Sequence, residues 1–298
     1  INITVYSDVA VVTLIAATNV DTANTVTAAT DLTIDADGTV TSADLLTGGD
    51  NVSITAGGAV AVDDITATAG DVNVTTTGAF TNAALIQALA GNVNISADTS
   101  ITTTGNVDAN DALSFVSAGT IQTIGTIEGA TVNMESTGAD LNIDNTVNAT
   151  TGNATLIADT NITAANTITA IDVATLTAGN DITLADEVTA DTITLTSLGN
   201  MTVEELDAAT TITASSGGTF QNTAAVDADA GAVTIQSVGT VTTDGTVAGN
   251  SVNIESTTAD LDINNTVDSD VAGVTLIAAT NVDTANTETA ATELTIDA

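Results

Sequence analysis

Residues 251–270 read SVNIESTTADLDINNTVDSD, and this stretch decides the fold. Val252 and Ile254 alternate with polar neighbours, as do Leu261 and Ile263, and one further valine follows the two asparagines. Because successive side chains of a strand point to opposite faces, the alternation places the aliphatic residues on one face and their polar neighbours on the other. The stretch therefore predicts three short strands, with corners at ESTTA, NN and DSD, that form one rung of about 20 residues.

The same unit recurs along the chain at a spacing of about 20 residues. Examples begin GDVNVTTTG at 70, GNVNISADT at 91, TVNMESTGA at 131, DTITLTSLG at 191 and GAVTIQSVG at 231. A single rung cannot bury its apolar face, whereas rungs stacked ~4.8 Å apart bury it as a continuous column of Val, Ile, Leu and Ala. The sequence thus predicts an all-β fold, a parallel β-helix or solenoid of about 15 rungs.

Two longer repeats lie above the rung. Residues 1–36 are equivalent to residues 263–298, an offset of 263 − 1 = 262, and residues 111–170 are equivalent to residues 231–290, an offset of 231 − 111 = 120. Both offsets are close to multiples of 20, so we expect residues 1–298 to form a single continuous solenoid segment. Because the chain starts without Met and ends almost as it began, we also expect it to be one period of a longer chain.

Glu288 departs from the alternation. Its equivalents in the two repeats are Val26 and Ile168, which are expected to point inward. A buried carboxylate without a partner is costly or becomes protonated, and this chain has no cation to pair with it. Either the strand turns Glu288 outward or the carboxyl group stays neutral.

An antiparallel sandwich or barrel would also use many short strands. Such a fold predicts hairpin turns and varied loop lengths, whereas the spacing here stays near 20 residues with no long insertion. Aromatic residues make up only 1% of the chain, as expected for a narrow aliphatic core. We expect Phe80, Phe115 and Phe220 to fill core positions that other rungs give to Ile, Leu, Val or Met.

The composition excludes several classes of function. The 298 residues include no Lys, Arg or His but 38 Asp and Glu, which give a net charge of −38. Binding to nucleic acid or to an anionic membrane needs cationic side chains, so neither partner is expected. No apolar run approaches the ~20 residues of a spanning helix, so we expect no membrane insertion. The chain has no Cys and therefore no disulfide framework.

The units resemble the repeat region of filamentous-haemagglutinin-type adhesins, which are large bacterial exoproteins of the two-partner secretion class. The resemblance rests on VATLTAGNDITLADEVTA (173–190) and NVSITAGGAVAVDD (51–64), where alternating strands are punctuated by AGG or AGN corners, and it covers essentially the whole chain. It implies a right-handed parallel β-helix, export to the cell surface, and a role as stalk, filament or adhesin. A complete lack of basic residues is not typical of that family.

Catalysis is not expected from these residues. Acid–base chemistry on a β-helix needs converging carboxylates or a basic residue in a groove, whereas rungs of constant length provide no groove walls. We interpret the pairs Glu204–Glu205 and Asp63–Asp64 as solvated corners, and we predict no catalytic residue and no required cofactor.

The candidate metal ligands are Asp35, Asp37 and Asp44. They lie in DADGTVTSAD (35–44), which matches part of a calcium loop. The expected first ligand position is Thr33, and TIDA recurs at 295–298 in an ordinary strand, which weakens the match.

The charge as a whole predicts diffuse cation binding. About 15 rungs at ~4.8 Å span ~70 Å, and 38 charges over that length give one per ~2 Å, close to the one per ~1.7 Å of duplex DNA. We therefore expect Ca²⁺ or Mg²⁺ to associate diffusely with the chain and to bridge neighbouring copies.

These features favour a non-enzymatic structural repeat of a long extracellular surface fibre or adhesin stalk, which associates with itself end to end or laterally. The alternative is a binding module with a glycan-, mineral- or ice-binding face. Threonine pairs such as Thr25 with Thr27 suggest an ordered array, but TIEG (126–129) and TVAG (246–249) interrupt it. Stacked Asn side chains are expected to form hydrogen-bonded ladders along the corners.

Overall fold

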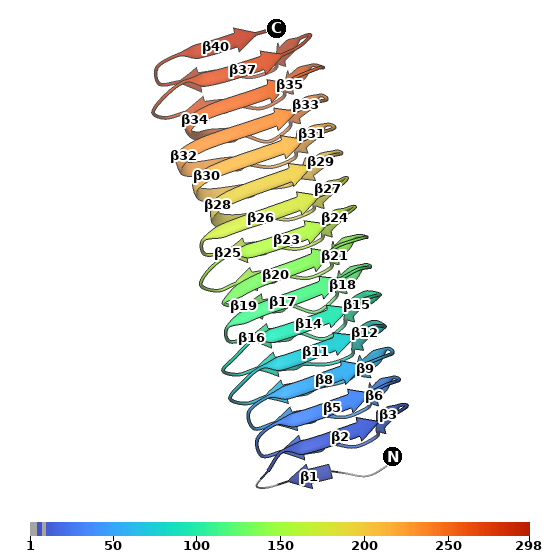
Figure 1. The fold of residues 1–298 in the computed structure, drawn as a ribbon. Coiled ribbons are helices and arrows are strands. Elements are labelled where there is room, and N and C mark those ends of the chain that lie inside the picture. The colour runs from blue at the N-terminus through green and yellow to red at the C-terminus, as the bar shows by residue number, and fades with distance from the viewer. Residues whose placement is uncertain (1–4, 8–9) are drawn as a thin grey trace. The chain divides into compact units, whose positions relative to one another are not determined.

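The computed structural model describes residues 5–7 and 10–298, and within this part of the chain every regular element is a β-strand. The strands are parallel and stack as a β-solenoid of about 14 turns, roughly 20 residues apart (Figure 1). The predicted parallel β-helix with three short strands per turn is confirmed, and its handedness stays a prediction. The chain divides into two compact units, Ile1–Thr150 and Thr151–Ala298, which we describe separately.

In the first unit each complete turn carries one strand on each of three faces. The first face consists of β2 (Val12–Ala16), β5 (Leu32–Ala36), β8 (Val52–Ala56), β11 (Val72–Thr76), β14 (Val93–Ala97), β17 (Ala112–Ser117) and β20 (Thr131–Ser136). The second face consists of β3 (Val20–Thr22), β6 (Val40–Ser42), β9 (Val60–Val62), β12 (Ala79–Asn82), β15 (Ser100–Thr103), β18 (Ile121–Thr123) and β21 (Leu141–Ile143). The third face consists of β1 (Val5–Ser7), β4 (Val26–Ala28), β7 (Leu46–Gly48), β10 (Ile65–Ala67), β13 (Ile86–Ala88), β16 (Val107–Ala109), β19 (Ile127–Gly129) and β22 (Val147–Ala149).

The second unit uses the same three faces, but four of its strands continue from the third face into the first. These are β28 (Val188–Ser197), β30 (Leu206–Ser216), β32 (Val226–Ser237) and β34 (Val247–Ser256). The separate strands of the first face are β23 (Ala154–Ala158), β26 (Val173–Ala178), β37 (Val274–Ala278) and β40 (Leu294–Asp297). Those of the second face are β24 (Ile162–Ala164), β27 (Ile182–Leu184), β29 (Met201–Val203), β31 (Phe220–Asn222), β33 (Val241–Thr243), β35 (Leu261–Ile263) and β38 (Val282–Thr284). Those of the third face are β25 (Ile168–Ala170), β36 (Val267–Ser269) and β39 (Glu288–Ala290). Where the long strands pair, their register shifts between Ala190 and Thr192 and again between Ala208 and Ile212, so a bulge takes the place of the expected corner.

The core is a set of aliphatic columns produced by the register between turns. In the first unit Ile34 pairs with Ile54, which in turn pairs with Val74, and each is at most 1% exposed. The alternating aliphatic residues of 251–270 are likewise buried. Phe80, Phe115 and Phe220 are completely buried, which confirms the prediction that they fill the core.

Two of the predicted corners begin later than expected. Glu255 and Ser256 continue β34, and Asp268 and Ser269 belong to β36, so each strand carries one more inward position. These inward serines are tolerated because their hydroxyls reach carbonyl oxygens: Ser256 Oγ donates to Gly239 at 2.9 Å. The predicted strands ended too early because the prediction counted only apolar residues as inward positions.

The long repeats coincide with the strands. Adding 262 to the bounds of β2, Val12–Ala16, gives those of β37, Val274–Ala278, and adding 120 to the bounds of β21, Leu141–Ile143, gives those of β35, Leu261–Ile263. Residues 1–4 and 8–9, with which the 262-residue repeat begins, lie outside the described residues. That the chain forms a single continuous segment stays a prediction.

Glu288 faces the core side of its strand. It pairs with Val267, at the position that Val26 occupies in the first unit, and its side chain is partly buried. Its Oε1 is buried and has no hydrogen-bond partner among the described residues. The strand therefore does not turn Glu288 outward.

Candidate functional surfaces

The three candidate metal ligands lie at different places on one turn. Asp35 points outward from β5, Asp37 lies in the following corner, and Asp44 lies in the corner between β6 and β7. Asp44 is engaged locally, because its Oδ1 accepts from the Leu45 amide at 2.8 Å and its Oδ2 from the Thr25 hydroxyl at 3.2 Å. In the described part of the chain no group of three or more His, Cys, Asp or Glu could hold a metal ion.

The two carboxylate pairs weighed for catalysis both lie at corners. Asp63 and Asp64 lie between β9 and β10, and Glu204 and Glu205 lie between β29 and β30. Asp64 Oδ1 accepts the amide of Leu85 on the next turn at 2.9 Å. This bond gives Asp64 a structural role in joining neighbouring turns.

Acidic side chains gather on the third face of the second unit. Asp207 pairs with Asp227 on the next turn, and neither has a cation nearby because the chain contains none. Desolvation, together with Asp229 and Glu187, raises the pKa of Asp207. Desolvation, followed by the charges of Asp229 and Asp207, likewise raises the pKa of Asp227. This stack therefore holds protons more tightly than isolated carboxylates would.

A smaller acidic pair lies on the third face of the first unit. Asp108 is in register with Glu128 of the following turn. Desolvation and the charge of Glu128 raise the pKa of Asp108. Glu128 also accepts a hydrogen bond at 3.0 Å from Asn148 Nδ2, one turn further on.

Polar ladders run along the corners, as the sequence predicted. In the first unit, the Asn51 amide and Nδ2 both donate to Asp31 Oδ1, and the Asp71 amide donates to Asn51 Oδ1 at 2.8 Å. The ladder continues over the next two turns. The Asn92 amide donates to Asp71 Oδ1 at 2.8 Å, and the Ala112 amide donates to Asn92 Oδ1 at 3.0 Å. Side chains at the corners thus join one turn to the next beside the backbone ladder.

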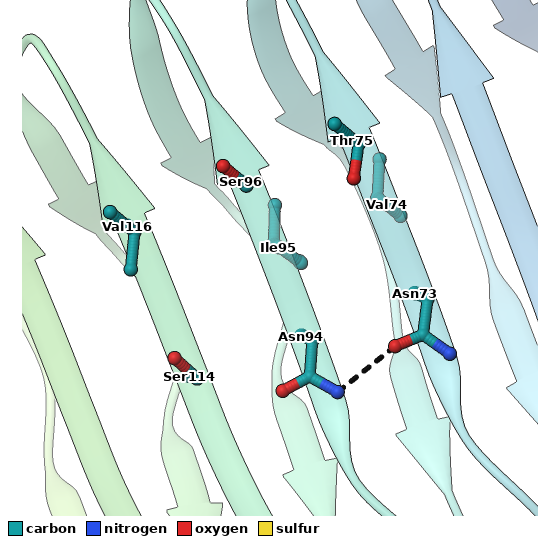
Figure 2. A pocket seen from close by; sticks show the side chains of 8 residues that line it. All are labelled: Asn73, Val74, Thr75, Asn94, Ile95, Ser96, Ser114 and Val116. Carbon is teal, nitrogen blue, oxygen red and sulfur yellow. Dashed lines mark hydrogen bonds between the residues drawn. The ribbon is translucent and has the colours of Figure 1, made fainter.

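The first face of the first unit carries a shallow depression of about 240 Å³ (Figure 2). Polar side chains from β11, β14 and β17 line it. Asn94 Nδ2 donates to Asn73 Oδ1 of the neighbouring turn at 3.0 Å. Thr75, Ser96 and Val116 line the same surface further along the strands. The depression is open, mixes polar and aliphatic side chains, and contains no acid–base pair among its lining residues.

A column of threonines occupies the first face of the second unit. Its members are in register on five consecutive turns and point outward: Thr155, Thr175, Thr194, Thr213 and Thr234. A second, shorter column consists of Thr177, Thr196 and Ser215. The threonine pairs singled out in the sequence lie on other strands. This column could not be predicted, because only the register shows which threonines share a face.

A set of polar side chains, among them Asn82 and Asn222, points into the core from the ends of second-face strands, and the alternation of apolar residues does not predict it. A signal for them exists in the sequence. FTNAALIQALAGNVNI (80–95) recurs as FQNTAAVDADAGAVTI (220–235), an offset of 220 − 80 = 140.

Comparison with family models, with curated proteins and with solved structures finds no match for this chain. No helix long and apolar enough to span a membrane occurs in residues 5–7 and 10–298.

Proposed function

We propose that the chain is a non-enzymatic structural repeat of an extracellular surface fibre or adhesin stalk. The observation that carries this proposal is the repetition of one turn, with parallel register and a continuous aliphatic core, through each unit. Such a stack transmits load through backbone hydrogen bonds and can be lengthened turn by turn. The resemblance to filamentous-haemagglutinin-type repeats supports the same role and an export to the cell surface.

Self-association belongs to this proposal. Turns of one repeated shape can continue from one copy to the next, end to end. The charge of −38 keeps the sides of neighbouring copies apart until cations bridge them.

The test is antibody labelling of intact cells that carry the protein. An antibody is needed because amine-reactive labels find no lysine in the chain. It should be raised against the folded chain. We expect labelling of unpermeabilised cells to equal that of permeabilised cells. Labelling that requires permeabilisation would contradict the proposal.

A binding face is the second candidate, and the threonine column of the second unit favours it. Stacked turns repeat the hydroxyl and methyl groups every ~4.8 Å, which suits a periodic ligand such as ice better than a single small molecule. Uptake of the chain into slowly growing ice tests this candidate. We expect Thr194→Tyr, at the centre of the column, to reduce uptake. Thr41→Tyr, on the second face of the first unit, should leave it unchanged, because its neighbours in the register are Asp21 and Ala61. Equal uptake by the two variants would rule the column out.

A further inference from the structure

The second-face strands end in side chains that point into the core, and in two places these side chains are polar. In the first unit, Asn82, Thr103 and Thr123 are in register on three consecutive turns and are 3%, 0% and 0% exposed. In the second unit, Asn222 and Thr243 repeat the arrangement and are both 0% exposed. We call these two sets the inner polar columns.

The oxygen atoms of the inner polar columns lack protein partners. Among the described residues, Asn82 Oδ1, Thr103 Oγ1 and Thr123 Oγ1 are buried without a hydrogen bond, and so are Asn222 Oδ1 and Thr243 Oγ1. Burying such groups unpaired is unfavourable, and in native proteins ordered water commonly satisfies them. Five such atoms at equivalent positions of the fold therefore point to one shared cause.

Other inward polar side chains of the same fold are satisfied directly. Thr22 Oγ1 donates to Ser42 Oγ at 2.8 Å on the next turn, and Ser42 Oγ donates to the Asp44 carbonyl at 2.9 Å. Inward serines at the first corner, such as Ser136, donate to carbonyl oxygens, here that of Gly119 at 2.8 Å. The inner polar columns are thus exceptions within a structure that otherwise pairs its buried hydroxyls.

The asparagines are oriented so that their oxygen atoms remain unpaired. Asn222 Nδ2 donates to the Ala224 carbonyl at 2.7 Å, and Asn82 Nδ2 donates to the equivalent carbonyl of Ala84. An exchange of the amide nitrogen and oxygen would set two acceptors against each other, so Oδ1 is left without a partner. A donor must therefore reach Oδ1 from outside the protein.

Aliphatic side chains close both columns. In the first unit Val62 precedes Asn82 in the register, and Ile143 follows Thr123. Both are nearly fully buried, at 3% and 1% exposed. In the second unit Val203 and Ile263, each 0% exposed, take the same places. Each column is therefore enclosed.

We propose that each inner polar column holds ordered internal water, one molecule per step between neighbouring turns. Two hydrogen bonds of ~2.8 Å that meet at a tetrahedral water span ~4.6 Å, close to the ~4.8 Å between stacked strands. Water can donate to Asn82 Oδ1 and also bond the Thr103 hydroxyl, and backbone carbonyls have a second lone pair to offer. A bound Ca²⁺ would need six to eight oxygen ligands, and these columns contain no carboxylate.

The sign of a thermal shift tests the proposal. Thr103→Val keeps the shape of the side chain and removes only its hydroxyl. If water bridges Asn82 and Thr103, the variant removes one of that water's hydrogen-bond partners. We then expect the Tm to fall by roughly 2 °C. If the column is dry, Val replaces an unsatisfied hydroxyl by a methyl group and the Tm rises, which would overturn the proposal.

Matched variants separate this effect from the general effect of Thr→Val. Thr102→Val, on the outward side of the same strand, should leave the Tm nearly unchanged. Thr243→Val, with Thr242→Val as its control, should reproduce the result in the second unit. A crystal structure at high resolution should show density between Asn82 Oδ1 and Thr103 Oγ1, and empty space there would contradict the proposal.

The identity of the bound species is tested with salts. At equal ionic strength, the Tm difference between Thr103→Val and the parent chain should be the same in sodium, potassium and N-methylglucamine chloride. A difference that depends on the cation would show a bound ion in place of water and would overturn the proposal.

Discussion

At the scale of single residues, Gly105 and Gly245 have no room for a side chain at the corner between the second and third faces. A Cβ built on Gly105 would lie 1.7 Å from the carbonyl oxygen of Ala84, and one built on Gly245 would lie 1.7 Å from that of Ala224. No described residue has a positive φ, so the requirement comes from the close approach of the next turn and not from backbone conformation. The two carbonyl groups are those that accept from Asn82 and Asn222.

Gly105→Ala should therefore destabilise the fold by about 1–3 kcal/mol, the usual cost of overpacking, because backbone atoms must shift. Thermal or denaturant unfolding measures the change. Gly58→Ala is the matched control, since the nearest atoms to its Cβ would lie 3.2 Å away. Equal stability of the two variants would show that the turns can separate at this corner at no cost.

Residue-scale features could be predicted only in part from the sequence. The alternation identified inward aliphatic residues such as Ile254 and the three buried phenylalanines, because apolar character and inward direction coincide there. It missed Asn82 and Thr103, because a polar side chain at an inward position looks like the start of a corner. Glu288 was found because its equivalent in the repeat is Val26.

At the scale of elements, the third face of the second unit concentrates like charges. Asp207 and Asp227 are stacked on neighbouring turns, and desolvation with nearby carboxylates raises the pKa of both. Desolvation, followed by Glu187 and Asp207 among other carboxylates, raises the pKa of Glu205 as well. The folded chain therefore binds protons at a pH where the unfolded chain has released them.

This linkage makes the fold more stable in mild acid than at neutral pH. The stability that these groups contribute is fully present below the ordinary Asp value of 3.8 and is lost as the pH rises through the raised folded pKa. We expect the Tm to rise as the pH falls from 7 towards 4. A Tm that falls steadily over this range would contradict the expectation.

Asp227→Asn isolates the stacked pair. It should stabilise the chain at pH 7 by about 0.2–1 kcal/mol, the range for a cross-strand pair, and should flatten the dependence of the Tm on pH. Asp159→Asn changes the net charge equally at an exposed corner of the same unit and is the control. If both variants change the stability and the pH dependence of the Tm equally, the net charge and not the Asp207–Asp227 stack causes the change.

The order and register of the elements could be predicted from one rung, because the period of about 20 residues recurs and each turn repeats the same alternation. The four strands that continue from the third face into the first, such as β30, could not be predicted. In β30, residues 209–211 separate the third-face segment from the first-face segment, and the structure accommodates them in a bulge.

At the scale of the whole molecule, 38 negative charges and no positive charge dominate the behaviour in solution. Screening by salt acts on all of them, and divalent cations neutralise a dense array more effectively than monovalent ones do. Diffuse association needs no dedicated metal site.

Millimolar Ca²⁺ or Mg²⁺ at low ionic strength should therefore raise the Tm by a few degrees and promote bundling, more than NaCl does at the same ionic strength. Light scattering and thermal unfolding in chelator, Ca²⁺ and NaCl measure both effects. No difference between chelator and millimolar Ca²⁺ would refute diffuse cation binding.

The most direct test of the structural role is electron microscopy of the native material, antibody-labelled for this chain, beside its mass under denaturing conditions. The mass assignment must use cleavage at acidic residues, because trypsin finds no Lys or Arg. We predict that the label follows extended filaments built from parallel rungs. A label confined to compact globular particles would contradict the account.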